Sequence, residues 1–437
     1  MNKKQQEAIQ LAEFAIHCAQ KHGAEQVNVY IQSSENEKLV ITDGETENLS
    51  YNEQQAIIIS LYHNERNNTI TCSHLNKEAL EQFIINGINN IKYLAPDPYE
   101  RQLPKNLCYD EGYIDLGLYD ENIDNVDFDR QKDICLTEQQ RIVGSDVITS
   151  SCGINKKKAE KLCLFSNGFF GISRETILSI YTSATISDSN EMRRQHYESR
   201  TYINGDHLGA ENLGSRTLSY ARAKKGAESI ESGRYTTIIH NSITPDILDP
   251  LISATYGSKI YDKHSFLCNK IDKKITSDIL TIQCLPRTYG RIGAKTFTSD
   301  GLPATDMNVI TNGVLNNYFI NYRYSLKMQM APTLDLPICT TVTPGLRTTS
   351  EIISTTRKGI LITDFLGGNC NPVSGDFSYG IEGFLIENGV ITKPISEMLI
   401  TGNILELMQQ LVEIGTLPHT PGKSPYPALV FENATIN

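Results

Sequence analysis

Hydrophobic and polar positions follow two different periods in the first hundred residues, and together they predict a helix, a meander and a second helix. The first helix has an apolar stripe at helical spacing and ends at Gly23; the stripe comprises Leu11, Phe14, Ala15, Cys18 and Ala19. Strand-length apolar runs follow at 27–31, 39–41, 56–62 and 69–72. A second helical pattern begins at Asn76 and ends before Pro96. We expect a small antiparallel sheet between these helices.

The middle of the chain alternates between irregular and regular patterns. Residues 99–125 are acidic, rich in tyrosine and irregular, and a helical pattern begins near Phe128. The strand-like runs 162–165 and 177–186 flank a Ser-Asn-Gly turn, which predicts a hairpin. Between Met192 and Glu231, charge is dense and apolar periodicity is weak, as in an exposed helix or a linker. We therefore expect an N-terminal domain at 1–190, a charged connection at 191–230 and a C-terminal domain at 231–437.

Short strands separated by Asp-Gly and Asn-Gly turns dominate the chain after Gly233. A helix is expected around Pro245 to Tyr256. A terminal helix is expected from Asn403 to Ile414, because Asn403 can cap it and Gly415 follows its end. The predicted fold class is α+β: an N-terminal helix-meander-helix domain and a C-terminal, mostly antiparallel β domain with a terminal helix.

Composition narrows the functional classes. The 437 residues suit two to three domains, and the net charge of -11 offers no general attraction to nucleic acid or to anionic membranes. Apolar runs are too short for a membrane helix, and the polar N-terminal pattern is not that of a signal peptide. The ten cysteines are scattered without a CxxC pair. This spacing is typical of buried thiols in a reducing cytoplasm.

Metal-binding patterns are sparse. A zinc-peptidase helix needs two histidines one turn apart and a glutamate after the first, but none of the nine histidines precedes a glutamate. His17 and His22 are the only close histidine pair, with Cys18 between them, and we interpret them as a surface histidine and a histidine at a helix end. His264 and Cys268 share a helical spacing but supply only two ligands. The sequence therefore predicts no metal bound by this chain.

Nucleophilic and nucleotide-binding motifs are equally scarce. Cys370 lies in a glycine-rich loop, yet no base stands beside it in sequence, so a free thiol in a tight turn is the favoured interpretation. The chain has no GxSxG, Walker A or GxGxxG motif. A basic and aromatic cluster is interpreted as a solvated face, with an anionic ligand as the alternative; it comprises Arg193, Arg194, Tyr197, Arg200 and Tyr202.

Several segments closely resemble the TldD/PmbA family, particularly its PmbA (TldE) branch. The most specific stretch is GGNCNPVSGDFSYG at 367–380, followed by GFLIENG at 383–389, PISE at 394–397 and TGN at 401–403. Looser matches are DPY at 97–99, GLP at 301–303 and ITNGVL at 310–315. The resemblance covers nearly the whole chain.

The resemblance implies a cytoplasmic two-domain protein that pairs with a TldD partner. Together they would form a zinc protease for unfolded or flexible peptides, and family members were first described as modulators of DNA gyrase. In the TldD branch, a His-Glu helix with a second histidine and a cysteine near the C-terminus supply the metal site. The corresponding stretch here, TPDILDPLISATY at 244–256, has no histidine, and the tail 415–437 has no cysteine. At 299–301 the chain has Ser-Asp-Gly, where the family usually has a more acidic Asp-Asp-Glu-Gly.

Three functions remain open, and the first two belong to different classes. The first is a TldE-like subunit that is not catalytic alone, with zinc expected in the TldD-like partner. The second is a non-proteolytic peptide-binding or gyrase-modulating protein. A cysteine hydrolase using Cys370 ranks third, and a homodimer is expected in isolation. No catalytic residue is assigned; the expected family-motif or substrate-binding residues are Gly367, Gly368, Asn369, Gly375, Asp376, Phe377 and Ser378.

Overall fold

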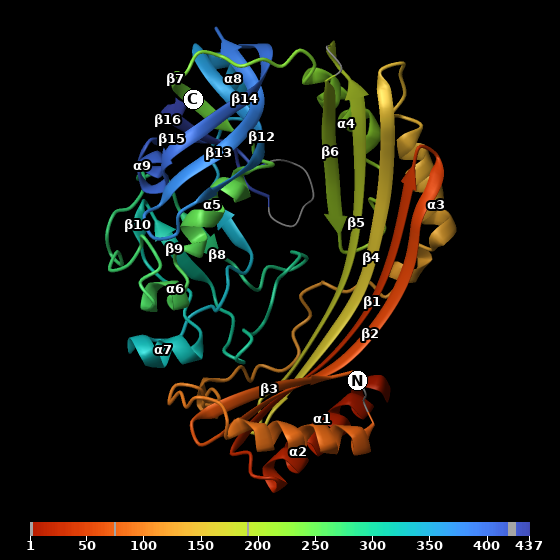
Figure 1. The fold of residues 1–437 in the computed structure, drawn as a ribbon, viewed down its shortest axis with the longest axis vertical. Helices are drawn as coiled ribbons and strands as arrows, with labels where there is room; N and C mark the ends of the chain where they lie inside the picture. Colours follow the sequence, from red (N-terminus) through yellow and green to blue (C-terminus); the bar gives the residue numbers. More distant parts are fainter. Residues whose placement is uncertain (1–2, 74–75, 190–191, 418–424) are drawn as a thin grey trace.

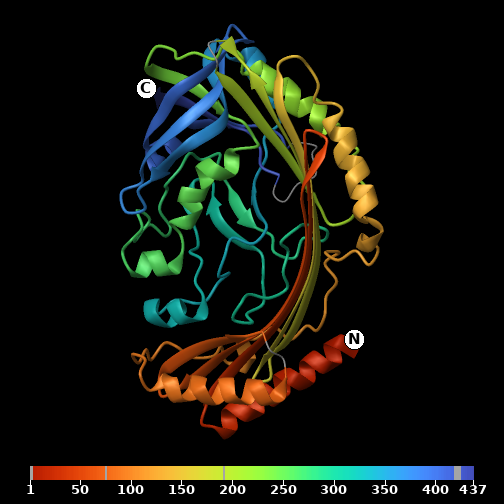
Figure 2. The ribbon, with the colours of Figure 1, turned by 45° about the vertical axis from the view of Figure 1, so that its right-hand side comes forward.

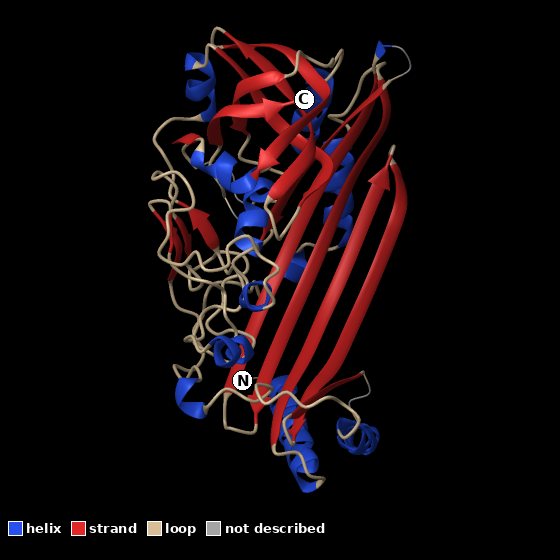
Figure 3. Ribbon diagram, turned by 60° about the vertical axis from the view of Figure 1, so that its left-hand side comes forward, coloured by secondary structure: helices blue, strands red, loops and turns tan. Residues whose placement is uncertain are grey.

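The computed structural model describes residues 3–73, 76–189, 192–417 and 425–437. A long curved sheet dominates the first half of the chain, with strand order β3-β2-β1-β4-β5-β6 and antiparallel pairing throughout (Figure 1). Figure 3 shows its longest strands running side by side along much of the molecule. The strands are β1 (Gln26–Thr42), β2 (Glu45–His63), β3 (Arg66–Cys72), β4 (Val147–Phe165), β5 (Phe170–Ser187) and β6 (Arg193–Tyr202).

The expectation of several short strands after the first helix was wrong. Residues 27–31 and 39–41 belong to one strand, β1, because the polar stretch between them also pairs with both neighbours. Ser34, for example, lies opposite Gln54 of β2 and Ala159 of β4. No continuous apolar face marks this middle part, so alternation alone did not indicate that the strand continues.

Helices cover the sheet at its two ends. α1 (Lys3–Lys21) and α2 (Lys77–Ile91) bury an apolar cluster that includes Leu11, Val29 and Leu80. α3 (Phe128–Gln139) and α4 (Leu213–Ala223) belong to the other end, where the core includes Leu39 and Ile154. Figure 2 shows the sheet curving around the C-terminal region, with α3 and α4 on its outer face. The short 3-10 helices η1 (Lys105–Leu107) and η2 (Ile123–Asn125) lie in the expected irregular connection.

The segment 191–230 contributes regular structure to the first sheet where it is described. β6 pairs with β5 along its length, and α4 packs against both strands. Most of the segment therefore packs as part of the N-terminal region and does not form an exposed linker. The division into domains at 190 and 230 stays a prediction.

A barrel forms the core of the C-terminal region. The strand order is β14-β13-β12-β7-β16-β15, and the additional pairing of β14 with β16 closes the ring. The β7–β12 pair is parallel, whereas the other pairs are antiparallel. The strands are β7 (Gly233–Ile239), β12 (Lys358–Cys370), β13 (Asp376–Glu387), β14 (Val390–Asn403), β15 (Leu411–Ile414) and β16 (Leu429–Ile436).

Helices and a smaller sheet pack beside the barrel. The smaller sheet has the order β10-β9-β8-β11, with β8 (Ile282–Cys284), β9 (Met307–Thr311), β10 (Val314–Leu315) and β11 (Thr340–Val342). The helices are α5 (Thr244–Ser253), α6 (Gly257–Tyr261), α7 (Tyr322–Met328), α8 (Thr349–Thr355) and α9 (Ile404–Gln409). The predicted α+β class, with a β-rich C-terminal region, is confirmed. In the described part of the chain, no helix is long and apolar enough to cross a membrane.

The expected terminal helix was too long. Asn403 does cap α9, but the helix ends at Gln409 and residues 411–414 form β15. Leu411 pairs with Phe431 of β16, so its side chain is buried by sheet pairing rather than by continuation of the helix. Helical spacing in residues 411–414 was thus overridden by a strand that arrives later in the chain.

Aromatic and ionic contacts join the two regions. The rings of Phe169 and Phe297 meet edge to face at 5.3 Å between centroids. The Tyr109 amide donates to the Gly301 carbonyl at 2.8 Å, which places the GLP motif against the N-terminal region. Near the other end, Lys224, the C-cap residue of α4, lies 3.0 Å from Asp364 and 2.9 Å from Glu382. The curved sheet is therefore fixed to the C-terminal region at separate points.

Candidate functional site

The expected motif residues gather at the tip of the β12–β13 hairpin. Gly368 pairs with Tyr379, Asn369 with Ser378, and Cys370 with Phe377. Gly367 precedes this ladder and Gly375 lies in the turn. The structure thus brings all seven expected residues into one hairpin.

Hydrogen bonds within residues 371–376 determine the shape of the turn. The Asn371 amide donates to the Asp376 carbonyl at 2.7 Å, and the Gly375 amide donates to the Asn371 carbonyl at 2.8 Å. The side-chain oxygen of Asn371 accepts from the Val373 amide at 2.9 Å. Gly375 has a φ of +83°, which favours glycine. The turn is therefore specified locally by Asn and Gly.

Asp376 anchors the hairpin to α9. Its carboxylate accepts from Asn403 Nδ2 at 3.0 Å and from Ser374 Oγ at 2.7 Å. The hydrogen bond from Asn403 and then that from Ser374 lower the pKa of Asp376. Asn403 also accepts from the Leu405 amide at 3.1 Å and so caps α9. These contacts support a structural role for Asp376.

Beyond Ile362, β12 has one edge without a strand partner among the described residues. β7 pairs with β12 only from Gly359 to Ile362, whereas β13 continues along the opposite edge as far as Cys370. Leu366 is 58% exposed on this projecting part, and Gly367, Gly368 and Asn369 are exposed as well. We call residues 364–370 the β12 free edge. An unpaired edge offers backbone groups to an extended peptide.

The acidic residues of α5 contribute to the electrostatics around this hairpin. Burial, then the charges of Cys370 and Asp249, raises the pKa of Tyr379 to about 12. Burial and the neighbouring Asp249 raise the pKa of Asp246. Aromatic contacts continue on the hairpin, where Tyr379 lies 5.3 Å from Phe365 and 5.5 Å from Phe377 between ring centroids. The motif at 367–380 contains Tyr379, but the expected site residues did not include it. The link to α5 was not predicted, because no local pattern connects residues so far apart.

The Cys370 thiol is poorly suited to nucleophilic attack. Burial and the Asp376 charge raise its pKa, which disfavours the thiolate at neutral pH. Its sulfur donates weakly to the Asn371 carbonyl at 3.9 Å. Cys370 is a free thiol, as expected, but it is the last residue of β12 and pairs with Phe377 rather than lying in the turn itself.

Metal-binding side chains do not converge near α5 in the described structure. α5 contains two aspartates and no histidine. Among residues 3–73, 76–189, 192–417 and 425–437, the only group of at least three histidine, cysteine or carboxylate ligands is Cys18, His22 and Glu81. Cys18 is on α1, His22 directly follows its end and Glu81 is on α2; both helices lie far from α5 in Figure 1. The described residues around α5 therefore do not fit the zinc of a metallopeptidase.

The other candidates from the sequence have separate surroundings. His17 is exposed and lies outside the metal-binding group, and Cys268 donates weakly to the Ile260 carbonyl at 3.6 Å. In the basic cluster, Arg194 pairs with Asp188 at 2.8 Å and Arg200 pairs with Glu211 at 2.6 Å. The charges of both arginines are paired within the chain. Arg194 is buried, so the expectation of a solvated face was wrong at this residue.

Asp300 in the Ser-Asp-Gly segment also has an internal partner. Its carboxylate accepts from the Tyr322 amide at 2.9 Å. Burial is the main cause of the raised pKa of Asp300. The segment therefore supports the start of α7, next to the contact between the two regions.

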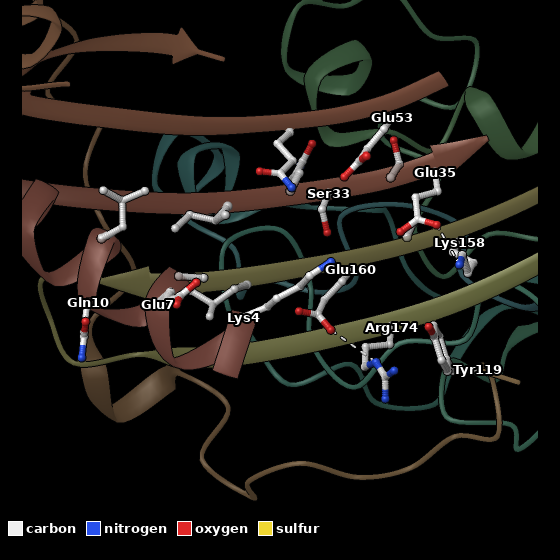
Figure 4. A pocket seen from close by; sticks show the side chains of 18 of the residues that line it. Lys4, Glu7, Gln10, Ser33, Glu35, Glu53, Tyr119, Lys158, Glu160 and Arg174 are labelled. Atoms are coloured by element: carbon white, nitrogen blue, oxygen red, sulfur yellow. Dashed lines mark ion pairs between the residues drawn. The ribbon is translucent and has the colours of Figure 1, made fainter. Parts of the chain in front are cut away.

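Two cavities border opposite faces of the curved sheet. One, of about 460 Å³, lies between the sheet and the loops of the C-terminal region and is lined by Gln32, Ser34, Lys157, Thr296 and Asp335. The other, of about 660 Å³, lies beside α1 (Figure 4). There Lys158 pairs with Glu35 at 2.7 Å, and Arg174 pairs with Glu160 at 3.3 Å. The charges around this second cavity are largely balanced. The cavity between the two regions also has an apolar lining, which includes Leu118, Phe297 and Leu336.

Comparison with known proteins gives a consistent family match. Residues 232–437 match the model of the PmbA/TldA metallopeptidase C-terminal domain. A crystal structure from Bacteroides thetaiotaomicron, described as a candidate modulator of DNA gyrase, is 33% identical, with 98% of each chain covered and a TM-score of 0.95. A metalloprotease PmbA homologue from Buchnera aphidicola is 25% identical over 400 residues, 89% of this chain and 88% of that protein.

A TldE structure from Thermococcus kodakarensis has a TM-score of 0.84 at 17% identity, covering 98% of this chain and 99% of that chain. At this identity, the likeness shows the fold alone. The same long-stranded architecture therefore persists through extensive sequence divergence.

Proposed function

This chain belongs to the PmbA/TldD family, and we propose that it is the PmbA (TldE)-type subunit of a TldD/TldE zinc metalloprotease. In this proposal the TldD-like partner holds the zinc, and the present chain binds unfolded or flexible peptides beside it. It is not catalytic alone. The metalloprotease names of its relatives and the histidine-free α5 support this division of labour.

The β12 free edge is the observation that carries the proposal. Its backbone groups can align an extended peptide, and such hydrogen bonds do not depend on the peptide's side chains. Sequence-independent contacts suit an unfolded substrate. The exposed Leu366 adds an apolar surface next to Gly367 and Gly368. The seven motif residues would then position this edge rather than perform proton transfer.

The zinc in the partner would polarise the scissile carbonyl and activate water. The residues of this chain would hold the peptide extended and restrict its movement near the metal. A homodimer in isolation is a further prediction, which light scattering on the purified chain tests. A cytoplasmic location, and no direct contact with nucleic acid or membranes, also stay predictions.

The decisive experiment measures zinc content and cleavage of an unfolded peptide for the chain alone, a TldD-like homologue alone and the mixture. We expect activity to rise in the mixture and to disappear with a chelator. Zinc-dependent cleavage by the isolated chain would overturn the proposed division of labour. Peptide binding without cleavage in either preparation would favour the alternative, a non-proteolytic peptide-binding or gyrase-modulating protein.

A variant pair tests the β12 free edge within the active mixture. Leu366→Asp is expected to lower kcat/KM for the unfolded peptide, because it places a charge beside the peptide-binding backbone. The matched control is Leu346→Asp, since Leu346 is 97% exposed and lies outside the hairpin. Equal activity of both variants in folded, assembled complexes would remove the β12 free edge from the substrate path.

A further inference from the structure

Three potential metal ligands of different chemistry meet where the end of α1 approaches α2. One ligand atom from each of Cys18, His22 and Glu81 lies within 4.8 Å of the others. His22 Nε2 lies 3.9 Å from Glu81 Oε1. We propose that these three side chains bind Zn²⁺, with water completing the coordination. This site would be independent of the metal centre proposed for the partner.

The end of α1 positions two of the ligands. Cys18 and His22 are four residues apart, so their side chains lie on the same face, one turn from each other. The His22 amide donates to the Cys18 carbonyl at 3.1 Å, and the Ala24 amide donates to the Ala19 carbonyl at 3.0 Å. Gly23, between His22 and Ala24, has a φ of +106°, a conformation suited to a helix C-terminus. The backbone that carries His22 is thus constrained before metal arrives.

Packing of α2 against α1 supplies the third ligand. Leu80 and Ile84 of α2 share a buried core with Ala15 and Ala19 of α1. Glu81 follows Leu80 in this docked helix, and its charge is one cause of the raised pKa of Cys18, after burial. The cluster therefore depends on tertiary packing that folding already establishes. No large rearrangement is needed to bring the three side chains together.

Partial exposure of His22 and Glu81 leaves access for an ion. Cys18 is only 4% exposed, whereas the His22 and Glu81 side chains are 32% and 42% exposed. In a tetrahedral zinc site with bonds of about 2.0–2.3 Å, ligand atoms stand roughly 3.3–3.8 Å apart. In the proposed site, rotations of the two exposed side chains would bring ligand atoms that lie within 4.8 Å of one another to this spacing. Water can then occupy the open side.

The ligand set favours zinc over harder cations. Calcium and magnesium prefer oxygen ligands, whereas zinc accepts a thiolate, an imidazole and a carboxylate in one site. The cation would also lie at the C-terminal end of α1, where the helix dipole is negative. Binding transfers the Cys18 thiol proton to solvent and forms a sulfur–zinc bond. No oxidant or further reactant is required.

Zinc titration of the full-length chain tests the proposal, after chelator treatment and removal of the chelator. The background for all variants is Cys268→Ser/Cys370→Ser, because these two cysteines are the partly exposed ones outside the cluster. We expect one bound zinc per chain and a higher thermal unfolding temperature with zinc. Cobalt substitution should give a thiolate-to-metal charge-transfer band, which reports a cysteine ligand directly.

Matched variants decide whether the named residues bind the ion. His22→Gln and Glu81→Gln should each raise the zinc Kd by more than about tenfold, since loss of even a supporting partner of a metal ligand costs that much. His17→Gln and Glu78→Gln are the controls, because both residues are exposed on the same two helices outside the group. Cys18→Ser should abolish the cobalt–thiolate band. Unchanged zinc affinity in His22→Gln and Glu81→Gln, or equal losses in the controls, would overturn the proposal.

Discussion

Arg323 Nη2 lies 2.6 Å from Asp97 Oδ2, although 226 positions separate the two residues in sequence. Asp97 follows α2 in the N-terminal region, and Arg323 is in α7 of the C-terminal region. Lys327, one turn further along α7, lies 2.9 Å from the same carboxylate oxygen. This ion-pair network gives the DPY motif a physical role in joining the two regions.

Asp97→Asn should destabilise the protein by about 1–2 kcal/mol, because charged hydrogen bonds to Arg323 and Lys327 are lost. We expect a modest effect because the Arg323 side chain is 39% exposed and solvent screens the pair. Urea unfolding at neutral pH measures the difference. The exposed Asp133→Asn is the control, and equal effects of the two substitutions would exclude a special role for Asp97.

The pH dependence of stability should also differ in Asp97→Asn. Burial alone would raise the pKa of Asp97, but hydrogen bonds from Arg323 and Lys327 lower it from 3.8 to about 2. A lowered folded-state pKa stabilises the protein above the unfolded-state value, and this contribution is lost as pH falls through the folded-state value. The wild type should therefore lose its advantage over Asp97→Asn between about pH 4 and pH 2. Parallel stability curves over this range would contradict the assignment.

Gly367 and Gly368 provide a matched test of the hairpin geometry. Both have positive φ, +103° and +112°, but a Cβ at Gly367 would meet nothing within 4 Å, whereas one at Gly368 would lie 2.0 Å from the Ser378 carbonyl oxygen. Gly367→Ala should cost roughly 1–2 kcal/mol through backbone strain alone. Gly368→Ala should cost more than about 3 kcal/mol, because β13 must also move. Equal losses in urea unfolding would show that steric contact with Ser378 is unimportant.

Cys370→Ala should leave the peptidase activity of the mixed complex within about twofold of wild type. Burial and Asp376 raise the pKa of this thiol, so little thiolate is present at neutral pH. Cys268→Ala is the control for loss of a partly exposed cysteine. A large loss of kcat in Cys370→Ala alone would support the cysteine-hydrolase hypothesis instead.

Sequence periodicity predicted elements best where one face is continuously apolar. Periodicity and turn residues correctly predicted α1, α2, the β4–β5 turn and α5, because the local patterns of these elements agree with their tertiary packing. Periodicity divided β1 at the polar stretch around Ser34 and extended the terminal helix to Ile414, through the residues of β15. In both places, pairing with a strand distant in sequence decided the conformation, and a local pattern does not contain that information.

The candidate site was predictable only as a motif. The glycine-rich hairpin was visible in sequence, but the β12 free edge arises because β7 ends its pairing at Ile362. Likewise, the spacing of Cys18 and His22 was visible, but Glu81 joins them only through helix packing. The β12 free edge and the Cys18–His22–Glu81 cluster are both completed by tertiary contacts. Residue spacing alone therefore did not identify either of them.

Asn403 should couple the stability of the hairpin to the charge on Asp376. Its side chain donates to Asp376 Oδ1 at 3.0 Å and to the Ser374 carbonyl at 2.9 Å, while its oxygen caps α9. Asn403→Ala should cost about 1 kcal/mol through loss of the cap. It should also raise the pKa of Asp376 toward its ordinary value, because the main hydrogen bond that lowers it disappears.

Asn403→Asp separates these two effects. Aspartate preserves the oxygen that caps α9, but it places a second carboxylate beside Asp376 and removes the amide donor. The pKa of Asp376, measured by NMR titration of its carboxyl carbon, should therefore rise more in Asn403→Asp than in Asn403→Ala. The Asn403 hydrogen bond is the larger cause of the lowered pKa of Asp376, so stability should decline less steeply in Asn403→Ala than in wild type as pH falls below about 4. An unchanged Asp376 pKa in both variants would mean that Asn403 serves α9 alone.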